Sequence, residues 1–122
     1  MRNLTFVDNN EITLLESGVA FFPALIAALD AAKYEVLFET YIFAEDETGE
    51  RVRDALIRAA RRGVKVRVLV DWFGTGHRCC GRLGPELTAA GVQYRVFNPL
   101  CKRGIARSHR KIAVIDRAVA FV

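Results

Sequence analysis

A histidine and a lysine two residues apart begin an apolar segment close to the end of the chain. The segment covers 108–116, SHRKIAVID, and its apolar run predicts a buried β-strand. Because side chains alternate faces along a strand, His109 and Lys111 are expected to project side by side, about 6.5–7 Å apart. A lysine can neutralise the non-bridging oxygens of a phosphodiester while a neutral imidazole attacks phosphorus or passes a proton. The pair therefore predicts phosphodiester chemistry.

Asp116 closes the same segment. It lies an odd number of residues from His109 and from Lys111, so a flat strand would point it to the opposite face. We expect it to act from the following turn, to act through a bend, or to take no part. Each of the three residues also has a structural interpretation, as a strand-start histidine, a lysine that extends from a sheet edge, and a turn-initiating aspartate.

Strands and helices alternate along the rest of the chain. Strands are expected at 10–18, 34–43, 64–71, 92–98, 108–116 and 118–122. A first helix carries Phe22 to Leu29 with Pro23 in its first turn, a second ends at Gly63, and a short third covers 85–90 after a loop at 72–84. Strands separated by helices favour parallel pairing, which predicts an α/β fold with a mixed, mainly parallel sheet flanked by helices.

Two carboxylates stand where such a sheet collects ligands. Ligands gather at the carboxyl ends of the strands, and Glu39 and Asp71 lie within or at the end of apolar strands. Since a buried acid without a partner is costly, a paired structural carboxylate is the favoured interpretation of each.

The composition fits one globular domain. The 122 residues are 52% hydrophobic with a net charge of +4, and the longest charge-free run, 17–29, is too short to span a bilayer. No apolar block precedes the first acidic residues, so no signal peptide and no transmembrane segment are expected. The three cysteines suggest free thiols in a loop and a reducing compartment. His77, Cys79, Cys80 and Cys101 lack the ligand spacing of a zinc site, so no metal is predicted.

Charge is divided unevenly along the sequence. Residues 1–50 carry a net charge of −8 and residues 51–122 a net charge of +12. Acids at 45–50 and arginines at 58–62 match the dipole of the second helix. The bases left over are Arg78, Arg82, Lys102, Arg103, Arg107, Arg110 and Lys111. They suit an anionic partner such as phospholipid, nucleic acid or a phosphate ester.

The spacing H-x-K-x-x-x-x-D, formed by His109, Lys111 and Asp116, is the signature of the phospholipase D superfamily. The stretches ITLLESGVAFFPALIAALDAAKYEVLFETYIFAEDETG, AARRGVKVRVLVD and HRKIAVIDRAVAFV resemble the N-terminal half of a bacterial cardiolipin synthase. The resemblance implies a phospholipase D-type α/β sandwich and an enzyme without metal or other cofactor. It implies that His109 is the nucleophile, forming a phosphohistidine, or the general acid. Lys111 would hold the phosphate, and Asp116 would be a supporting carboxylate.

The chain departs from the family pattern in two ways. Ser108 stands where relatives often have asparagine, and His77 is followed two residues later by Cys79, so a second motif is missing. Residues 1–122 are therefore expected to be a single lobe, truncated at the C-terminus, of a two-lobed enzyme. The second half-site would come in cis or in trans, for example from a symmetric dimer.

Three functions remain open at this point. The first is a cardiolipin synthase-type phosphatidyltransferase that acts on phosphatidylglycerol, with anionic phospholipid as partner, peripheral on the cytoplasmic side of the cell membrane. Basic loops would meet the headgroups, and Trp72–Phe73 would either enter the interface or pack normally. The second is a dimeric phosphodiesterase or nuclease that tracks a phosphate backbone. The third is a non-catalytic half-domain whose last strand pairs with another chain.

Overall fold

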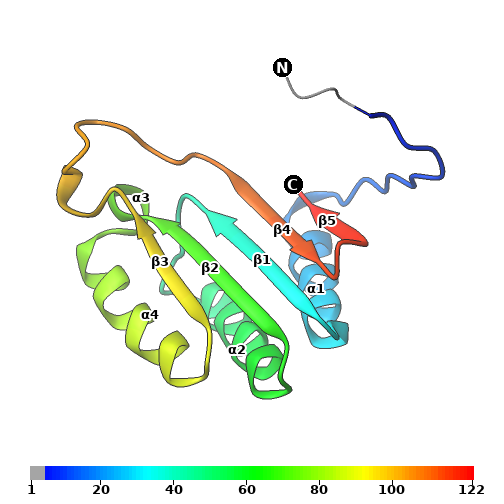
Figure 1. Cartoon of the computed structure of the whole chain (residues 1–122), viewed down its shortest axis with the longest axis horizontal. Coiled ribbons are helices and arrows are strands. Elements are labelled where there is room, and N and C mark those ends of the chain that lie inside the picture. Colours follow the sequence, from blue (N-terminus) through cyan, green and yellow to red (C-terminus); the bar gives the residue numbers. More distant parts are fainter. Residues whose placement is uncertain (1–4) are drawn as a thin grey trace.

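The computed structural model describes residues 5–122, which form one mixed sheet with helices packed against it (Figure 1). The elements in chain order are α1 (Ser17–Ala31), β1 (Glu35–Thr40), α2 (Glu47–Arg61), β2 (Lys65–Asp71), α3 (Trp72–Thr75), α4 (His77–Ala89), β3 (Gln93–Phe97), the 3-10 helix η1 (Pro99–Cys101), β4 (Lys111–Ile115) and β5 (Val119–Phe121). The strand order across the sheet is β3-β2-β1-β4-β5. The expected mixed α/β class is confirmed.

The direction of β4 decides where the candidate site lies. β1, β2 and β3 run parallel, whereas β4 is antiparallel to β1 and β5 is antiparallel to β4. Lys111, the first residue of β4, pairs with Thr40, the last residue of β1. Reversal thus brings the start of β4 to the edge where the parallel strands end. In Figure 1 the segment from η1 to β4 runs along this edge.

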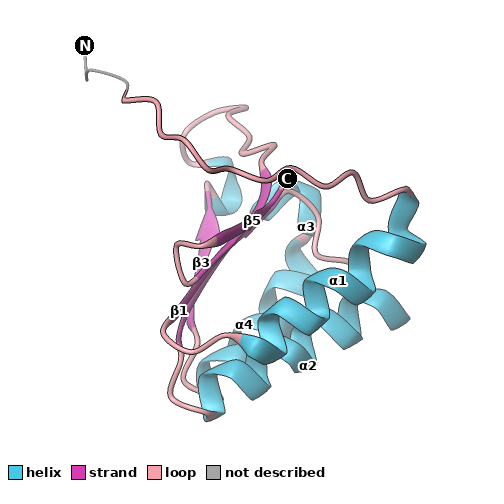
Figure 2. Ribbon diagram, turned by 90° about the vertical axis from the view of Figure 1, so that its right-hand side faces the viewer, coloured by secondary structure: helices cyan, strands magenta, loops and turns pink. Residues whose placement is uncertain are grey.

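The helices α1, α2 and α4 lie on the same side of the sheet (Figure 2). Alternate strand residues face them, because side chains on a strand change face at every step. The strand side chains Val36, Val66, Val68, Val70, Ala113 and Ile115 form one core with Leu25, Leu29, Leu56 and Leu87 of the helices. The helix-facing side of the sheet is therefore the buried one. Lys111, the first residue of β4, shares this side with Ala113 and Ile115.

The N-terminal strand predicted at 10–18 is wrong. Residues 7–16 have no regular structure, and α1 begins at Ser17. Ile12 is 94% exposed, so the apolar residues that suggested a strand have no sheet to join. Pro23 lies inside α1 rather than in its first turn. Proline has no N–H, so the Val19 carbonyl receives no helical hydrogen bond from residue 23. Val19 is exposed, so water can take the place of that donor.

The loop predicted at 72–84 is also wrong, because α3 and α4 occupy it. Polar residues and glycines hid the helical pattern of α4, in which Cys80, Leu83 and Leu87 recur at helical spacing and are buried. Cys79 and Cys80 are accordingly core thiols in a helix, not loop thiols, while Cys101 is half-buried.

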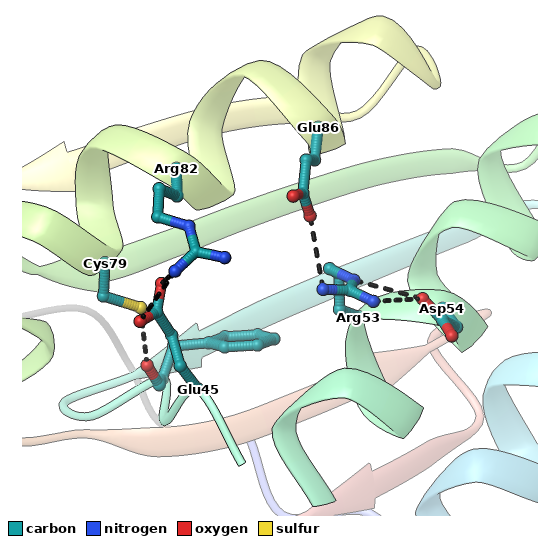
Figure 3. A network of polar contacts seen from close by, with 7 residues as sticks. Glu45, Arg53, Asp54, Cys79, Arg82 and Glu86 are labelled. Atoms are coloured by element: carbon teal, nitrogen blue, oxygen red, sulfur yellow. Dashed lines mark hydrogen bonds and ion pairs between the residues drawn. The ribbon is translucent and has the colours of Figure 1, made fainter. Parts of the chain in front are cut away.

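Polar contacts fix the connection between β1 and α2 to α4 (Figure 3). Arg82 of α4 pairs with Glu45 at 3.4 Å, and Arg53 of α2 pairs with Glu86 of α4 at 3.3 Å. The Cys79 thiol donates to the Phe43 carbonyl at 3.1 Å. Burial raises the pKa of Cys79 to about 11, so the thiol keeps the proton that it donates. These contacts hold the segment that follows β1 in place.

Candidate active site

His109 and Lys111 meet at the edge where β1 ends and β4 begins. Lys111 Nζ lies 3.1 Å from both His109 Nδ1 and His109 Nε2, and 3.4 Å from the His109 carbonyl oxygen. His109 precedes β4 rather than standing in it, and its ring still lies beside Lys111. An ammonium has only donors, and it can pair with the ring nitrogen that lacks a proton. Both residues are exposed, so a phosphate can reach them.

Tyr41 completes the surroundings of the pair. Its ring centroid lies 4.6 Å from that of His109, at an interplanar angle of 54°, and Lys111 Nζ lies 5.8 Å from the Tyr41 centroid. The Tyr41 carbonyl accepts a hydrogen bond from the Thr75 hydroxyl of α3 at 3.2 Å. Gly74 of α3 also packs on Tyr41, since a Cβ at residue 74 would lie 2.7 Å from a ring carbon. The helix α3 therefore supports the aromatic ring that contacts His109.

The residue before His109 is held by two carboxylates. Asp71 is only 1% exposed, and its Oδ2 accepts the Ser108 N–H at 2.7 Å. Its Oδ1 accepts the N–H groups of Phe73 and Gly74 at 2.9 and 3.0 Å, which caps α3. The Ser108 hydroxyl donates to Glu39 of β1. Both acids that were expected to be paired structural carboxylates are paired, and both hold Ser108.

Asp116 lies at the other end of β4 from His109. Its carboxylate accepts the N–H groups of Lys33, Tyr34 and Glu35 at 2.9, 2.8 and 2.9 Å. These donors favour the ionised form and lower the pKa of Asp116. The structure thus brings His109 and Lys111 together but does not place Asp116 with them. Asp116 acts from the turn after β4, where it joins β4 to the start of β1.

Sequence reasoning missed two neighbours of the histidine. Tyr41 gave no signal, because an aromatic residue in an apolar strand predicts only core packing. Ser108 was noted only as a departure from the family pattern, although its position before the histidine could have suggested a support. Arg110 is exposed, and its guanidinium lies 3.8 Å from the Glu39 carboxylate.

A basic and apolar surface lies beside the site. The guanidinium of Arg107 stacks 3.9 Å from the centroid of Phe73, which joins the loop before β4 to α3. Phe73, Leu100 and Ile105 are 58%, 62% and 89% exposed, and Lys102 and Arg103 lie between the last two in sequence. We call these six residues the loop surface. Within residues 5–122, no three His, Cys, Asp or Glu side chains are grouped as metal ligands would be.

The sequence of this chain matches a known protein family. Residues 25–122 match the family described as the PLD-like domain of cardiolipin synthase. The chain belongs to this family. The resemblance stated from the His109 motif is confirmed, and so is the phospholipase D-type fold. The cardiolipin synthase B of Salmonella typhimurium is 42% identical over 121 residues, which is 94% of this chain and 29% of that protein.

Other relatives agree with this assignment. The cardiolipin synthase of Clostridium perfringens is 36% identical over 98% of this chain and 26% of that protein. The chain therefore spans less than a third of the length of these relatives. Nuc, a phospholipase D family member from Salmonella typhimurium, has a similar fold with a TM-score of 0.66 and 21% identity, over 83% of this chain and 60% of that one. None of the described helices combines the length and the apolar character that a membrane crossing requires.

Proposed function

We propose that this chain is one lobe of a cardiolipin synthase-type phosphatidyltransferase. The observation that carries the proposal is the exposed contact between His109 and Lys111, in a chain whose relatives of 36–42% identity are cardiolipin synthases. Phosphatidylglycerol would be both donor and acceptor of the phosphatidyl group.

His109 and Lys111 can perform two of the roles that the reaction needs. A His109 ring nitrogen attacks the phosphorus of phosphatidylglycerol, the bond from phosphorus to the free glycerol breaks, and glycerol leaves with a proton from a general acid. The hydroxyl of a second phosphatidylglycerol then attacks the phosphohistidine and gives its proton to the same group, which is now a base. The phosphorus–nitrogen bond breaks and the imidazole is restored. The Lys111 ammonium neutralises the non-bridging oxygens in both steps, when charge on the phosphorus centre is greatest.

The general acid belongs to a second half-site. His77, the other histidine of the chain, begins α4 with its ring centroid 6.3 Å from that of Trp72, and Cys79 rather than a lysine follows it two residues later. We assign the proton donor to a second lobe, in the same polypeptide or in another chain. Residues 1–122 would then form a single lobe, and Asp116 would serve it by positioning β4 through the turn before β1.

The loop surface would bring this lobe to anionic phospholipid on the cytoplasmic side of a membrane. Lys102, Arg103 and Arg107 supply charge for the headgroups, while Leu100 and Ile105 supply exposed apolar side chains. Basic residues near a membrane surface contribute about 1 kcal/mol each, and the contribution falls with salt. Binding by this surface is therefore expected to weaken between low and physiological ionic strength.

The test is to incubate the chain with phosphatidylglycerol that carries a labelled phosphatidyl group. Intact-protein mass spectrometry would find a phosphatidyl adduct on the wild-type chain and none on His109→Ala, and thin-layer chromatography would find cardiolipin where a second half-site is present. An adduct retained in His109→Ala, or no adduct on the wild-type chain when a second lobe is supplied, would overturn the proposal. Metal-independent degradation of DNA without any lipid adduct would favour a nuclease instead.

A further inference from the structure

An open cavity of about 520 Å³ lies next to Lys111, between α1, the start of α2 and the sheet. Its walls are almost entirely apolar. The aromatic residues among them are Phe21, Phe22, Phe38, Phe43 and Phe121. Leu25 and Val52 are buried beneath it, and Ile42 at its edge is exposed. Apolar side chains thus line a hollow that they do not fill.

The charged residues in the lining of this cavity are Lys111, Glu39 and Asp46. Among the described residues that line it, the cation is Lys111, whose ammonium also contacts His109. The two carboxylates in the lining already have partners. Glu39 accepts the Ser108 hydroxyl, and Asp46 accepts the Gly49 N–H at 2.8 Å as the cap of α2. A ligand that enters the cavity therefore meets an apolar wall next to Lys111, the lysine that contacts His109.

We propose that this cavity binds one acyl chain of a phospholipid whose phosphodiester is held by Lys111 and His109. The inference rests on the proposed function for the position of the phosphate, and it adds the position of the acyl chain. A volume of about 520 Å³ falls within the range of about 300–1,000 Å³ typical of small-molecule sites. An amphiphile with a negative head and an apolar tail matches both ends of the space.

The proposal predicts how affinity depends on chain length. Each methylene moved from water into an apolar site improves affinity about fourfold, so two methylenes improve it about fifteenfold. The probes are lysophosphatidylglycerols with a single acyl chain of six, eight or ten carbons, used below their micelle concentrations, and glycerophosphoglycerol without a chain. Calorimetry on the whole chain gives the dissociation constants. A fifteenfold step from six to eight carbons is expected.

A matched pair of substitutions locates the binding site. Ala44 is exposed and lines the cavity, whereas Ala27 is exposed on α1 and does not line it. Ala44→Trp should obstruct the cavity and reduce the fifteenfold step to less than threefold, whereas Ala27→Trp should leave it unchanged. Circular dichroism melts confirm that both variants fold. Lys111→Ala should weaken every probe by a similar factor and leave the step between chain lengths intact.

The outcomes separate this inference from the proposed function. Equal steps in Ala44→Trp and Ala27→Trp, or no dependence on chain length in the wild type, would overturn the acyl site even if His109 forms its adduct. A chain-length step without any adduct on His109, even when a second lobe is supplied, would retain the acyl site and refute the transferase. A dimer seen by sedimentation, lost in Ala44→Trp and accompanied by no lipid binding, would mean that a second copy covers the cavity, and would overturn the acyl site.

Discussion

Replacing Asp71 should destabilise the chain more than replacing any exposed carboxylate, because it binds three backbone N–H groups inside the protein. Its side chain is 1% exposed and accepts from Phe73, Gly74 and Ser108. Loss of the cap costs about 0.5–2 kcal/mol, and loss of a hydrogen bond to a charged group costs about 1.5–3 kcal/mol. Asp71→Ala is therefore expected to lower the free energy of unfolding by about 2–5 kcal/mol. Asp71→Asn can keep the cap but presents an amide to the Ser108 N–H, so it should lose about 1.5–3 kcal/mol.

Urea unfolding measures both changes. The control is Asp54→Ala, which removes a carboxylate whose side chain is 52% exposed and paired with Arg53 at 3.0 Å. Such surface pairs contribute about 0–1 kcal/mol. The slope of the free energy against urea should be the same in all variants, so that the midpoints report stability. If Asp71→Ala unfolds at the same urea concentration as Asp54→Ala, the described role of Asp71 is refuted.

Three further outcomes are expected. Gly74→Ala should destabilise the chain by about 1–3 kcal/mol, because its Cβ would overlap the Tyr41 carbonyl oxygen and lie 2.7 Å from the Tyr41 ring. Gly81→Ala in α4, where nothing lies within 4 Å, should be neutral or stabilising, and equal urea midpoints for the two variants would contradict this. Asp116 has a lowered pKa when folded, so its contribution to stability is present above the unfolded pKa of about 3.9 and is lost as pH falls through the folded value. The difference in urea midpoint between wild type and Asp116→Asn should therefore shrink as pH falls from about 6 to about 3, and a constant difference would be inconsistent with it. Burial raises the pKa of Cys79 to about 11 and also raises that of Cys80. At pH 8 an aromatic disulfide reagent should therefore modify Cys101 quickly and the other two thiols only after unfolding. Rapid modification of all three cysteines in the folded chain would contradict the burial of Cys79 and Cys80.

Much of the fold could be predicted because the core segments carry strong patterns. The alternation in VKVRVLVD predicted β2, and the apolar stripe ending at Gly63 predicted α2, whose residue after the last turn has φ +90°. The strand at 10–18 failed because pattern alone does not show whether a partner strand exists. The helix predicted at 85–90 covered only the end of α4, and its earlier turns were missed because their buried positions are filled by cysteines and small residues as well as leucine.

The site was predicted in part for similar reasons. A two-residue spacing placed His109 beside Lys111, and the structure keeps them together although His109 stands outside the strand. The support from Asp71 connects residues 37 positions apart, and Tyr41 reaches His109 from the end of a different strand. Local patterns do not encode contacts of this kind, because they arise only when the sheet order sets β4 against β1.

The most direct test of the central claim uses the two histidines of the chain as an internal comparison. Nitrogen-15 NMR of the imidazole rings, during titration with glycerophosphoglycerol, reports binding at His109 and at His77 separately. We expect a saturable shift of the His109 resonances, no shift at His77, and loss of the His109 shift in Lys111→Ala. His109 resonances that do not shift on addition of the diester, or a shift that persists in Lys111→Ala, would contradict the claim that these two side chains together hold a phosphodiester.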